Sequence, residues 1–293
     1  MKDSEKNSKF GVKWKIDTGR IYQRKDEGIS VGRTLVELII LTSIIHLVDT
    51  LAYSVRLNSV KSGQVALSFS LFNIFALVSR TANTLQAPLI ASIIGFSIAH
   101  DLNPLIDMRL VIFAATSGTL LGVLFIPSFL RIFEKAVNRL EVTGSVPSLV
   151  VEALQINNIK RIVKSVSKPC KTMIERLRYR EIPKRLLILN SLVTGIYTVG
   201  VLAASYSAIL VAEEHRLAVV ASSGMINGIA SILLTLLIDP KSAMITDQAL
   251  RGKRPYNDVK ALVVLLITSK LVGTLLGQVL FLPAAQVIAY IYN

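Results

Sequence analysis

Residues 35–57, LVELIILTSIIHLVDTLAYSVRL, decide the fold class of this chain. The stretch is long enough to cross a bilayer as one helix, which takes about 20 apolar residues. Its polar members His46, Asp49, Tyr53 and Arg56 are spaced by three, four and three residues, so they share one helical face. An ionisable group near the centre of a membrane helix costs at least about 2–3 kcal/mol. We therefore interpret this face as the wall of a wet cavity, in a protein that moves or modifies something polar within a membrane.

The composition supports an integral membrane protein. The 293 residues are 52% hydrophobic, the mean hydropathy is +0.56, and the charged residues lie between the apolar runs. The net charge of +14 therefore indicates contact with membrane surfaces and no role in binding nucleic acid. The single cysteine, Cys170, excludes an internal disulfide framework and a cysteine-based metal cluster.

The hydropathy pattern predicts an all-α, polytopic protein with six transmembrane helices. The expected spans are 34–57, 64–98, 109–131, 185–211, 217–238 and 259–291. Pro88 is expected to break the second span, after which residues 88–98 bend, re-enter the membrane or lie along its surface. The predicted organisation is a polar N-terminal tail (1–33), a first three-helix half (34–132), a basic segment (133–184) and a second three-helix half (185–293).

Positive residues mark cytoplasmic loops, and they gather after the first, third and fifth spans. This places both termini outside, although the basic residues of the N-terminal tail argue for the opposite orientation. We give the three loops more weight because acidic residues dilute the charge of the tail. The basic segment 133–184 is then cytoplasmic, and the apolar residues Ile156, Ile159, Ile162, Val163 and Val166 within it suit a surface-lying amphipathic helix.

An internal repeat links the third and sixth spans. Residues 118–127 read GTLLGVLFIP and residues 273–283 read GTLLGQVLFLP, so nine of ten positions are identical after one insertion at Gln278. Three crossings per repeat would make the two halves inverted copies, an architecture that recurs in secondary transporters. The alternative interpretation is that the Gly-xxx-Gly spacing only packs helices together.

Two arginines are candidate ligands for an anionic headgroup. Arg56 lies in the predicted inner half of the membrane and Arg80 in the outer half, and arginine binds phosphate oxygens in pairs. Asp49 would hold one arginine when the headgroup is absent, or carry a coupling proton with His46. The alternative for Arg56 is an interfacial arginine that reaches toward the membrane surface.

Further polar residues within the spans are candidates for the same site. Asn73, Asn83 and Gln86 share a helical face with Arg80, and Lys270 could supply a third cation. For the amides, hydrogen bonding between helices is the alternative role. Ser223, Asn227 and Ser231 form a milder polar face on the fifth span. Asp239 precedes a proline where that span is expected to end, which is typical of a turn residue.

Signatures of enzymes are absent from the sequence. It contains no HExxH, no Gly-x-Ser-x-Gly, no P-loop and no paired acidic motif at metal-ligand spacing. The three histidines lie on different predicted elements, so we expect no metal and no cofactor.

Four short runs carry a family resemblance. HLVDTLAYSVR at 46–56, SLFN at 70–73, SRTAN at 79–83 and QAP at 86–88 resemble the Amj family, the alternate lipid II flippases of Bacillus and related bacteria. The resemblance is strongest over residues 40–90 and does not cover the polar tail. It implies a protein of the bacterial plasma membrane that moves lipid II, the undecaprenyl-diphosphate-linked disaccharide-pentapeptide, to the outer leaflet for peptidoglycan synthesis. Its partners would be lipid II, membrane lipids and other cell-wall synthesis proteins.

Three functions stay open at this level. The main hypothesis is a flippase that works by alternating access around a cationic cavity, with Tyr53 as a further member of the site. The first alternative is a phosphatase-like membrane enzyme acting on polyprenyl diphosphates, for which His46 is the only obvious base. The second is a scaffold that recruits partners through the basic segment. The energy source and the oligomeric state are not indicated.

Overall fold

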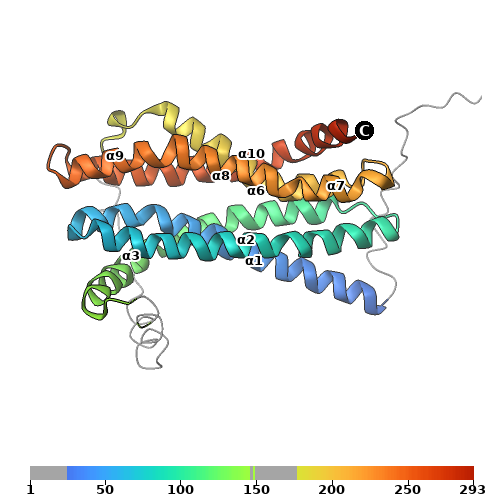
Figure 1. The fold of residues 1–293 in the computed structure, drawn as a ribbon, viewed down its shortest axis with the longest axis horizontal. Coiled ribbons are helices and arrows are strands. Elements are labelled where there is room, and N and C mark those ends of the chain that lie inside the picture. Colours follow the sequence, from blue (N-terminus) through green and yellow to red (C-terminus); the bar gives the residue numbers. More distant parts are fainter. Residues whose placement is uncertain (1–24, 146–147, 149–176) are drawn as a thin grey trace, which may run out of the picture.

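The described residues form six long helical stretches. The structure is a computed structural model that describes residues 25–145, 148 and 177–293 (Figure 1). These described residues contain no strand. The stretches that are long and apolar enough to cross a membrane are Val31–Ser62, Val65–Ala99, Leu105–Thr143, Lys184–Ser207, Glu213–Leu250 and Tyr256–Tyr292. The predicted all-α, six-span membrane protein is therefore confirmed. The amphipathic helix expected at 156–166 lies outside the described residues.

The first half of the chain supplies α1 (Lys25–Ser62), α2 (Val65–Ala99) and α3 (Leu105–Thr143). The second half supplies α6 (Lys184–Ser207), a broken fifth span and α10 (Tyr256–Tyr292). The fifth span consists of η3 (Glu213–His215), α7 (Arg216–Ala221), α8 (Ser223–Leu233), the π-helical η4 (Leu234–Ile238) and α9 (Asp239–Leu250). In Figure 1 the first half forms the lower layer and the second half the upper layer.

Pro88 does not break the second span, contrary to the sequence-based expectation. It lies inside α2, which runs without interruption from Val65 to Ala99. Proline removes one backbone donor, and within a membrane helix neighbouring side chains and small backbone adjustments can satisfy the freed carbonyl group. Residues 88–98 therefore continue α2 as helix.

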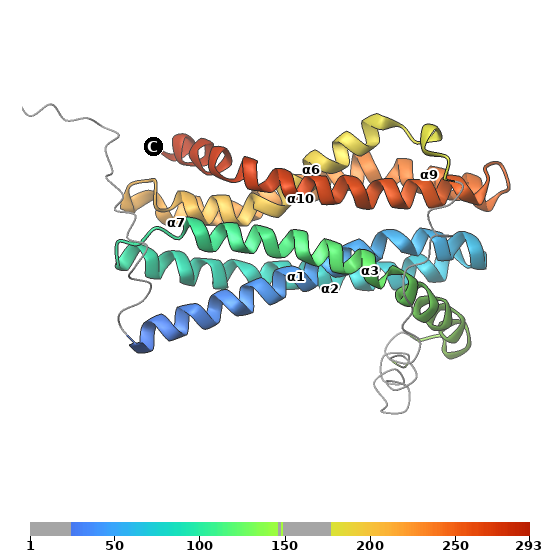
Figure 2. The same cartoon turned by 180° about the vertical axis from the view of Figure 1, so that it is seen from behind.

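Two helices extend beyond their predicted ends. α3 continues to Thr143, so the first turns of the expected basic segment 133–184 are helical, and Phe133 is buried between α1 and α2 residues. The fifth span continues past Asp239 to Leu250, and Pro240 lies in the first turn of α9, directly after the π-helical turn η4. The last turns of α3 leave the bundle at an angle, as Figure 2 shows from behind.

Glycine allows α1 and α3 to pack backbone to backbone. A Cβ atom at Gly118 would overlap the backbone carbonyl group of Ser43, and one at Gly122 would lie 2.6 Å from the Cβ of Thr50. The hydroxyl of Ser43 donates to the carbonyl oxygen of Ala114 at 3.1 Å. Close approach through glycine and serine is how helices associate where lipid removes the hydrophobic driving force.

The same contacts recur between α6 and α10. A Cβ atom at Gly273 would lie 2.5 Å from the carbonyl oxygen of Ser191, and one at Gly277 would meet the side chain of Val199. The hydroxyl of Ser191 donates to the carbonyl oxygen of Ser269 at 2.8 Å. In both pairs the acceptor residue lies four positions before the first glycine.

The apolar cores differ between the two ends of the bundle. At the end of the bundle that carries the α2–α3 turn, one apolar core joins both halves and includes Leu38, Ile93, Met108, Leu202 and Phe281. At the opposite end the buried core residues separate into a cluster of α1, α2 and α3 and a cluster confined to the second half. The two halves therefore share one apolar core at one end, whereas their apolar cores are distinct at the other end.

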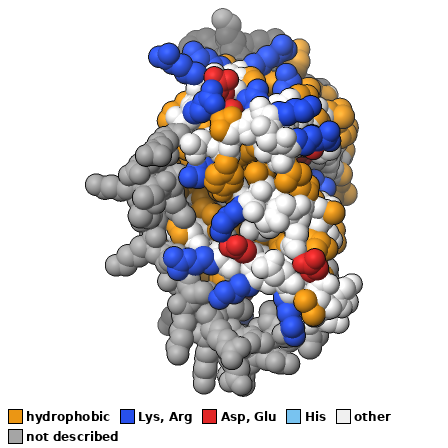
Figure 3. Space-filling model, turned by 90° about the vertical axis from the view of Figure 1, so that its left-hand side faces the viewer, with side chains coloured by type: hydrophobic (Ala, Val, Ile, Leu, Met, Phe, Trp, Pro, Cys, Tyr) orange, Lys and Arg blue, Asp and Glu red, His pale blue; other side chains and the backbone are white. Residues whose placement is uncertain are grey.

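Positive side chains surround the end of the bundle at which the apolar cores of the two halves are distinct. This basic end carries the α1–α2 turn, the C-terminal turns of α3, the start of α6 and the α9–α10 turn. Its cationic residues include Lys61, Arg131, Lys135, Arg178, Lys184, Arg185, Arg251, Lys253 and Arg254. Figure 3 views this end, where Lys and Arg side chains outnumber acidic ones.

Candidate functional site

A cavity of about 550 Å³ lies between the two halves. Helices of both halves line it, because the separate cores at the basic end leave space between α1 and α2 on one side and α6, α8 and α10 on the other. Its polar lining residues are His46, Asp49, Tyr53, Arg56, Asn73, Arg80, Thr194, Tyr197, Ser231, Thr235, Asp239 and Lys270. The volume falls in the range of sites that bind small polar ligands.

The polar face of α1 lies where its spacing predicts. His46, Asp49, Tyr53 and Arg56 all line the cavity, each one helical turn from the next. Ser43 and Thr50 on the same helix face α3 instead, where they meet the glycines. α1 therefore carries two faces with distinct tasks, one for packing and one for the cavity.

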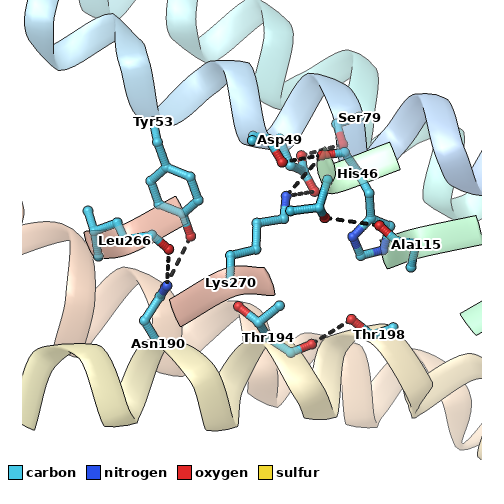
Figure 4. Close-up of polar contacts among 12 residues, drawn as sticks. His46, Asp49, Tyr53, Ser79, Ala115, Asn190, Thr194, Thr198, Leu266 and Lys270 are labelled. Atoms are coloured by element: carbon cyan, nitrogen blue, oxygen red, sulfur yellow. Dashed lines mark hydrogen bonds and ion pairs between the residues drawn. The ribbon is translucent and has the colours of Figure 1, made fainter. Parts of the chain in front are cut away.

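Lys270 of α10 is the cation that faces Asp49. Its Nζ lies 3.8 Å from Oδ2 of Asp49 and donates to the carbonyl oxygen of His46 at 3.2 Å, and its side chain is 4% exposed. Ser79 of α2 donates to the other carboxylate oxygen at 2.6 Å (Figure 4). The expectation that Asp49 holds an arginine is therefore wrong in this state. Lysine reaches the site because the sixth span passes beside α1, which sequence spacing alone does not reveal.

Arg56 of α1 pairs with Asp239 instead. Its Nη2 lies 3.1 Å from Oδ1 of Asp239, and the exposed fractions of the two side chains are 5% and 39%. The interpretation of Asp239 as a turn residue at a helix end is wrong. It lies inside the continuous fifth span, directly after the π-helical turn η4. Single π-helical turns inside longer helices frequently mark functional sites, because they turn a side chain away from the regular helical face.

A signal in the sequence could have identified Asp239. The polar face noted on the fifth span continues in steps of four from Ser231 to Thr235 and Asp239. Residues at this spacing lie on one side of a helix. Ser231, Thr235 and Asp239 all line the cavity, whereas Ser223 and Asn227 of the predicted polar face do not.

Tyr53 lies between the two cations that are paired with acids. Its ring centroid is 5.8 Å from Cζ of Arg56 and 5.9 Å from Nζ of Lys270. Its hydroxyl donates to Oδ1 of Asn190 at 3.0 Å, and Asn190 in turn donates to the Leu266 carbonyl oxygen (Figure 4). Asn190 also donates to the hydroxyl oxygen of Ser269. Asn190 was missed by sequence reasoning. The fully hydrogen-bonded amide of Asn190 fixes the ring of Tyr53. The ring lies between the two cations and attracts both through its face.

Arg80 reaches the cavity from α2. It is exposed, and the described residues include no ion-pair partner for it. Its neighbour Ser79 donates a hydrogen bond to Asp49, so Arg80 lies at the same depth in the cavity as Asp49. Arg56 lies seven residues further along α1, which is about 10 Å along the helix axis. Asn73 lines the cavity two helical turns closer to the basic end than Arg80. The two guanidinium groups therefore lie in one cavity at different depths.

Asn83 and Gln86 lie outside the main cavity. Gln86 is buried and donates from Nε2 to Oγ1 of Thr42 at 2.6 Å, linking α2 to α1. Together with His46 and Tyr197 these residues border a separate space of about 10 Å³. His46 and Tyr197 line both spaces, so they form the wall at which the main cavity ends.

The structure does not join His46 to Asp49 by a side-chain hydrogen bond. His46 is buried and its Nδ1 has no hydrogen-bond partner among the described residues, whereas the carboxylate of Asp49 is engaged by Ser79 and Lys270. Groups of three or more side chains able to hold a metal ion are absent from the described part of the chain.

Comparisons with known proteins agree with this architecture. A family model described as "Amj: Alternate to MurJ" matches residues 41–292. A curated protein of Bacillus subtilis (strain 168), named "Lipid II flippase Amj", is 38% identical over 250 residues, which cover 85% of this chain and 93% of the relative. No solved structure matches the chain. The family model covers all six spans apart from the start of the first, and the relative is aligned over nearly its whole length, so the chain belongs to the Amj family.

Proposed function

We propose that this protein is a lipid II flippase of the bacterial plasma membrane, which carries the undecaprenyl-diphosphate glycopeptide from the inner to the outer leaflet. The observation that carries the proposal is the cavity between the halves, with Arg56, Arg80 and Lys270 in its wall. The name of the 38% identical relative supports the same substrate. Passage of a diphosphate through hydrocarbon is prohibitive, and a wet, cationic path removes this barrier.

The diphosphate would meet Arg80 and Arg56 in the cavity. Arg80 is available, because the described residues include no carboxylate paired with it, and a guanidinium group binds phosphate oxygens in parallel pairs. Arg56 lies about 10 Å nearer the basic end. A headgroup that enters from that end would pass Arg56 before its diphosphate reaches the level of Asp49.

The lipid tail would remain in the bilayer during this passage. Leu77 of α2 lines the cavity and is 65% exposed, and Leu236 of η4, next to the cavity residue Thr235, is 66% exposed. These side chains support a lateral opening between α2 and the fifth span, through which the tail could extend into lipid.

Alternating access is supported by the two kinds of apolar core. A single core joins the halves at one end, while the cavity lies where the apolar cores of the halves are separate. A transporter that faces one side of the membrane has this asymmetry, and rocking of one half against the other would reverse it.

A 3+3 inverted repeat is supported by the matching contacts of the two halves. The Ser43–Ala114 and Ser191–Ser269 hydrogen bonds occupy equivalent positions, as do the glycines beside them. In this alignment Asp49 corresponds to Tyr197 and Arg56 to Ala204, so the scaffold would be repeated while the charge is not. One half would carry the headgroup site and the other would be the moving wall.

Complementation tests the proposed function. Cells depleted of their other lipid II flippase are expected to grow on the wild-type protein, and to stop growing with Arg80→Ala at equal membrane level, because the available guanidinium group is lost. Arg131→Ala, on the exposed surface of α3, is the matched control and should support growth. Normal growth with Arg80→Ala would remove Arg80 from the mechanism, and release of phosphate from lipid II by purified protein would favour the phosphatase alternative.

The basic end is proposed to face the cytoplasm. In a Cys170→Ser background, Lys253→Cys at the basic end should resist an impermeant maleimide in intact cells and react after the membrane is opened. Glu214→Cys, exposed at the opposite end, should react in intact cells. The reverse pattern of labelling would place the cavity on the outer side and contradict the direction proposed for transport.

A further inference from the structure

Arg56 is incompletely bonded for a buried cation. A guanidinium group has five N–H donors, and the described contacts of Arg56 are one hydrogen bond to Asp239 and the face of the Tyr53 ring. Its Nε is buried without a hydrogen-bond partner in the part of the chain that the structure describes. The ion pair with Asp239 therefore leaves hydrogen-bond donors of Arg56 unused.

Asp239 holds Arg56 from a position that allows it to leave. Its side chain is 39% exposed on the cavity, while that of Arg56 is 5% exposed. A displaced carboxylate could turn to the water of the cavity, so its release does not create a buried, unpaired charge. Asp49 differs, because Ser79 and the buried Lys270 both engage it.

The charges of the cavity wall leave one cation in surplus. Arg56, Arg80 and Lys270 are opposed by Asp49 and Asp239. A phospholipid with one monoanionic phosphodiester would neutralise Arg80 and find the remaining cations already paired. A diphosphate has a second anionic phosphate, which can replace the single bond of Asp239 with two parallel bonds to Arg56.

We infer that Asp239 is a specificity-determining residue, whose carboxylate occupies Arg56 until a diphosphate displaces it and so keeps monoanionic phospholipids out of the transport cycle. The inference rests on the proposed function, since it concerns the same cavity and the same arginine. In this inference Asp239 discriminates between substrates because its contact with Arg56 competes with the contact of a phosphate group with Arg56.

Reconstituted vesicles provide the test. Wild-type protein is expected to move labelled lipid II between leaflets and to leave labelled phosphatidylglycerol at the rate of protein-free vesicles. Asp239→Asn should move phosphatidylglycerol about tenfold faster than the wild type, the factor that one charge-assisted contact supplies. Asp247→Asn is the matched control, because Asp247 lies on the same helix and pairs with the exposed Arg251 at 3.0 Å.

A second variant separates selectivity from damage to the fold. Arg56→Gln combined with Asp239→Asn removes the guanidinium group that the carboxylate occupies, so phosphatidylglycerol should return to its background rate. Movement of phosphatidylglycerol by Asp239→Asn no faster than by the wild type would overturn the inference and, with lipid II movement by the wild type, leave the proposed function intact. Fast phosphatidylglycerol movement by the double variant would also overturn it, because this would indicate a leaky fold. Failure of the wild type to move lipid II would remove the proposed function, and the inference with it.

Discussion

Gly118→Ala is expected to prevent the protein from accumulating in the membrane. The added Cβ atom would overlap the backbone carbonyl group of Ser43 on α1, and neither backbone can move without separating α1 from α3. Overpacking of a close contact between side chains costs about 1–3 kcal/mol, and a clash between two backbones costs more. Gly273→Ala should also prevent accumulation in the membrane, because the added Cβ atom would lie 2.5 Å from the carbonyl oxygen of Ser191.

Membrane-fraction immunoblots and thermal unfolding of the purified protein would measure this effect. Gly228→Ala is the matched control, since it lies in α8 and a Cβ atom there would contact nothing within 4 Å. Alanine should be tolerated or slightly stabilising at that position, because glycine is the poorer helix former. Normal accumulation of Gly118→Ala would contradict the backbone contact between α1 and α3.

Asp49→Asn is expected to destabilise the protein more than Lys270→Met does. Removing the carboxylate leaves the buried ammonium group of Lys270 without a counter-charge, which costs about 3 kcal/mol in a buried pair. Removing the ammonium group costs less, because Asp49 is 30% exposed on the cavity and keeps its bond to Ser79.

The combination of both substitutions should recover stability. The asparagine side chain introduced by Asp49→Asn retains the size of the carboxylate and its capacity to accept a hydrogen bond from Ser79. The methionine introduced by Lys270→Met fills the space of lysine without its charge. The melting temperatures of the two single variants and the double variant, compared as a double-mutant cycle, measure the coupling. A double variant less stable than Asp49→Asn alone would contradict the direct Asp49–Lys270 interaction.

The fold could largely be predicted from the sequence because a bilayer imposes long apolar helices, and these are visible in one chain. The errors concern proline. Pro88 and Pro240 both lie within continuous helical stretches, although proline is expected to end or break a helix. Proline rules learned from water-exposed helices overstate the cost within a membrane, where neighbouring helices can satisfy the freed backbone groups.

The candidate site could be predicted more completely along one helix than between helices. The face of α1 follows from spacing alone, and all its members line the cavity. The partners could not be deduced in this way, because the contacts of Asp49 with Lys270 and of Arg56 with Asp239 join residues about 200 positions apart (221 and 183 by numbering). Such pairing depends on which helices are neighbours, and one sequence does not specify that arrangement.

The apolar core shared by both halves also determines where the membrane voltage acts. A water-filled cavity conducts, so most of the transmembrane potential would fall across the dry layer beyond His46 and Tyr197, over residues such as Ile93, Leu202 and Phe281. Moving one elementary charge through that layer is worth about 2.3 kcal/mol per 100 mV. In the proposed alternating-access cycle, with the basic end inside, the negative interior would drive an anionic diphosphate outward, and this driving force would act at the step that opens the shared core. In that cycle the membrane potential would contribute to export of the headgroup.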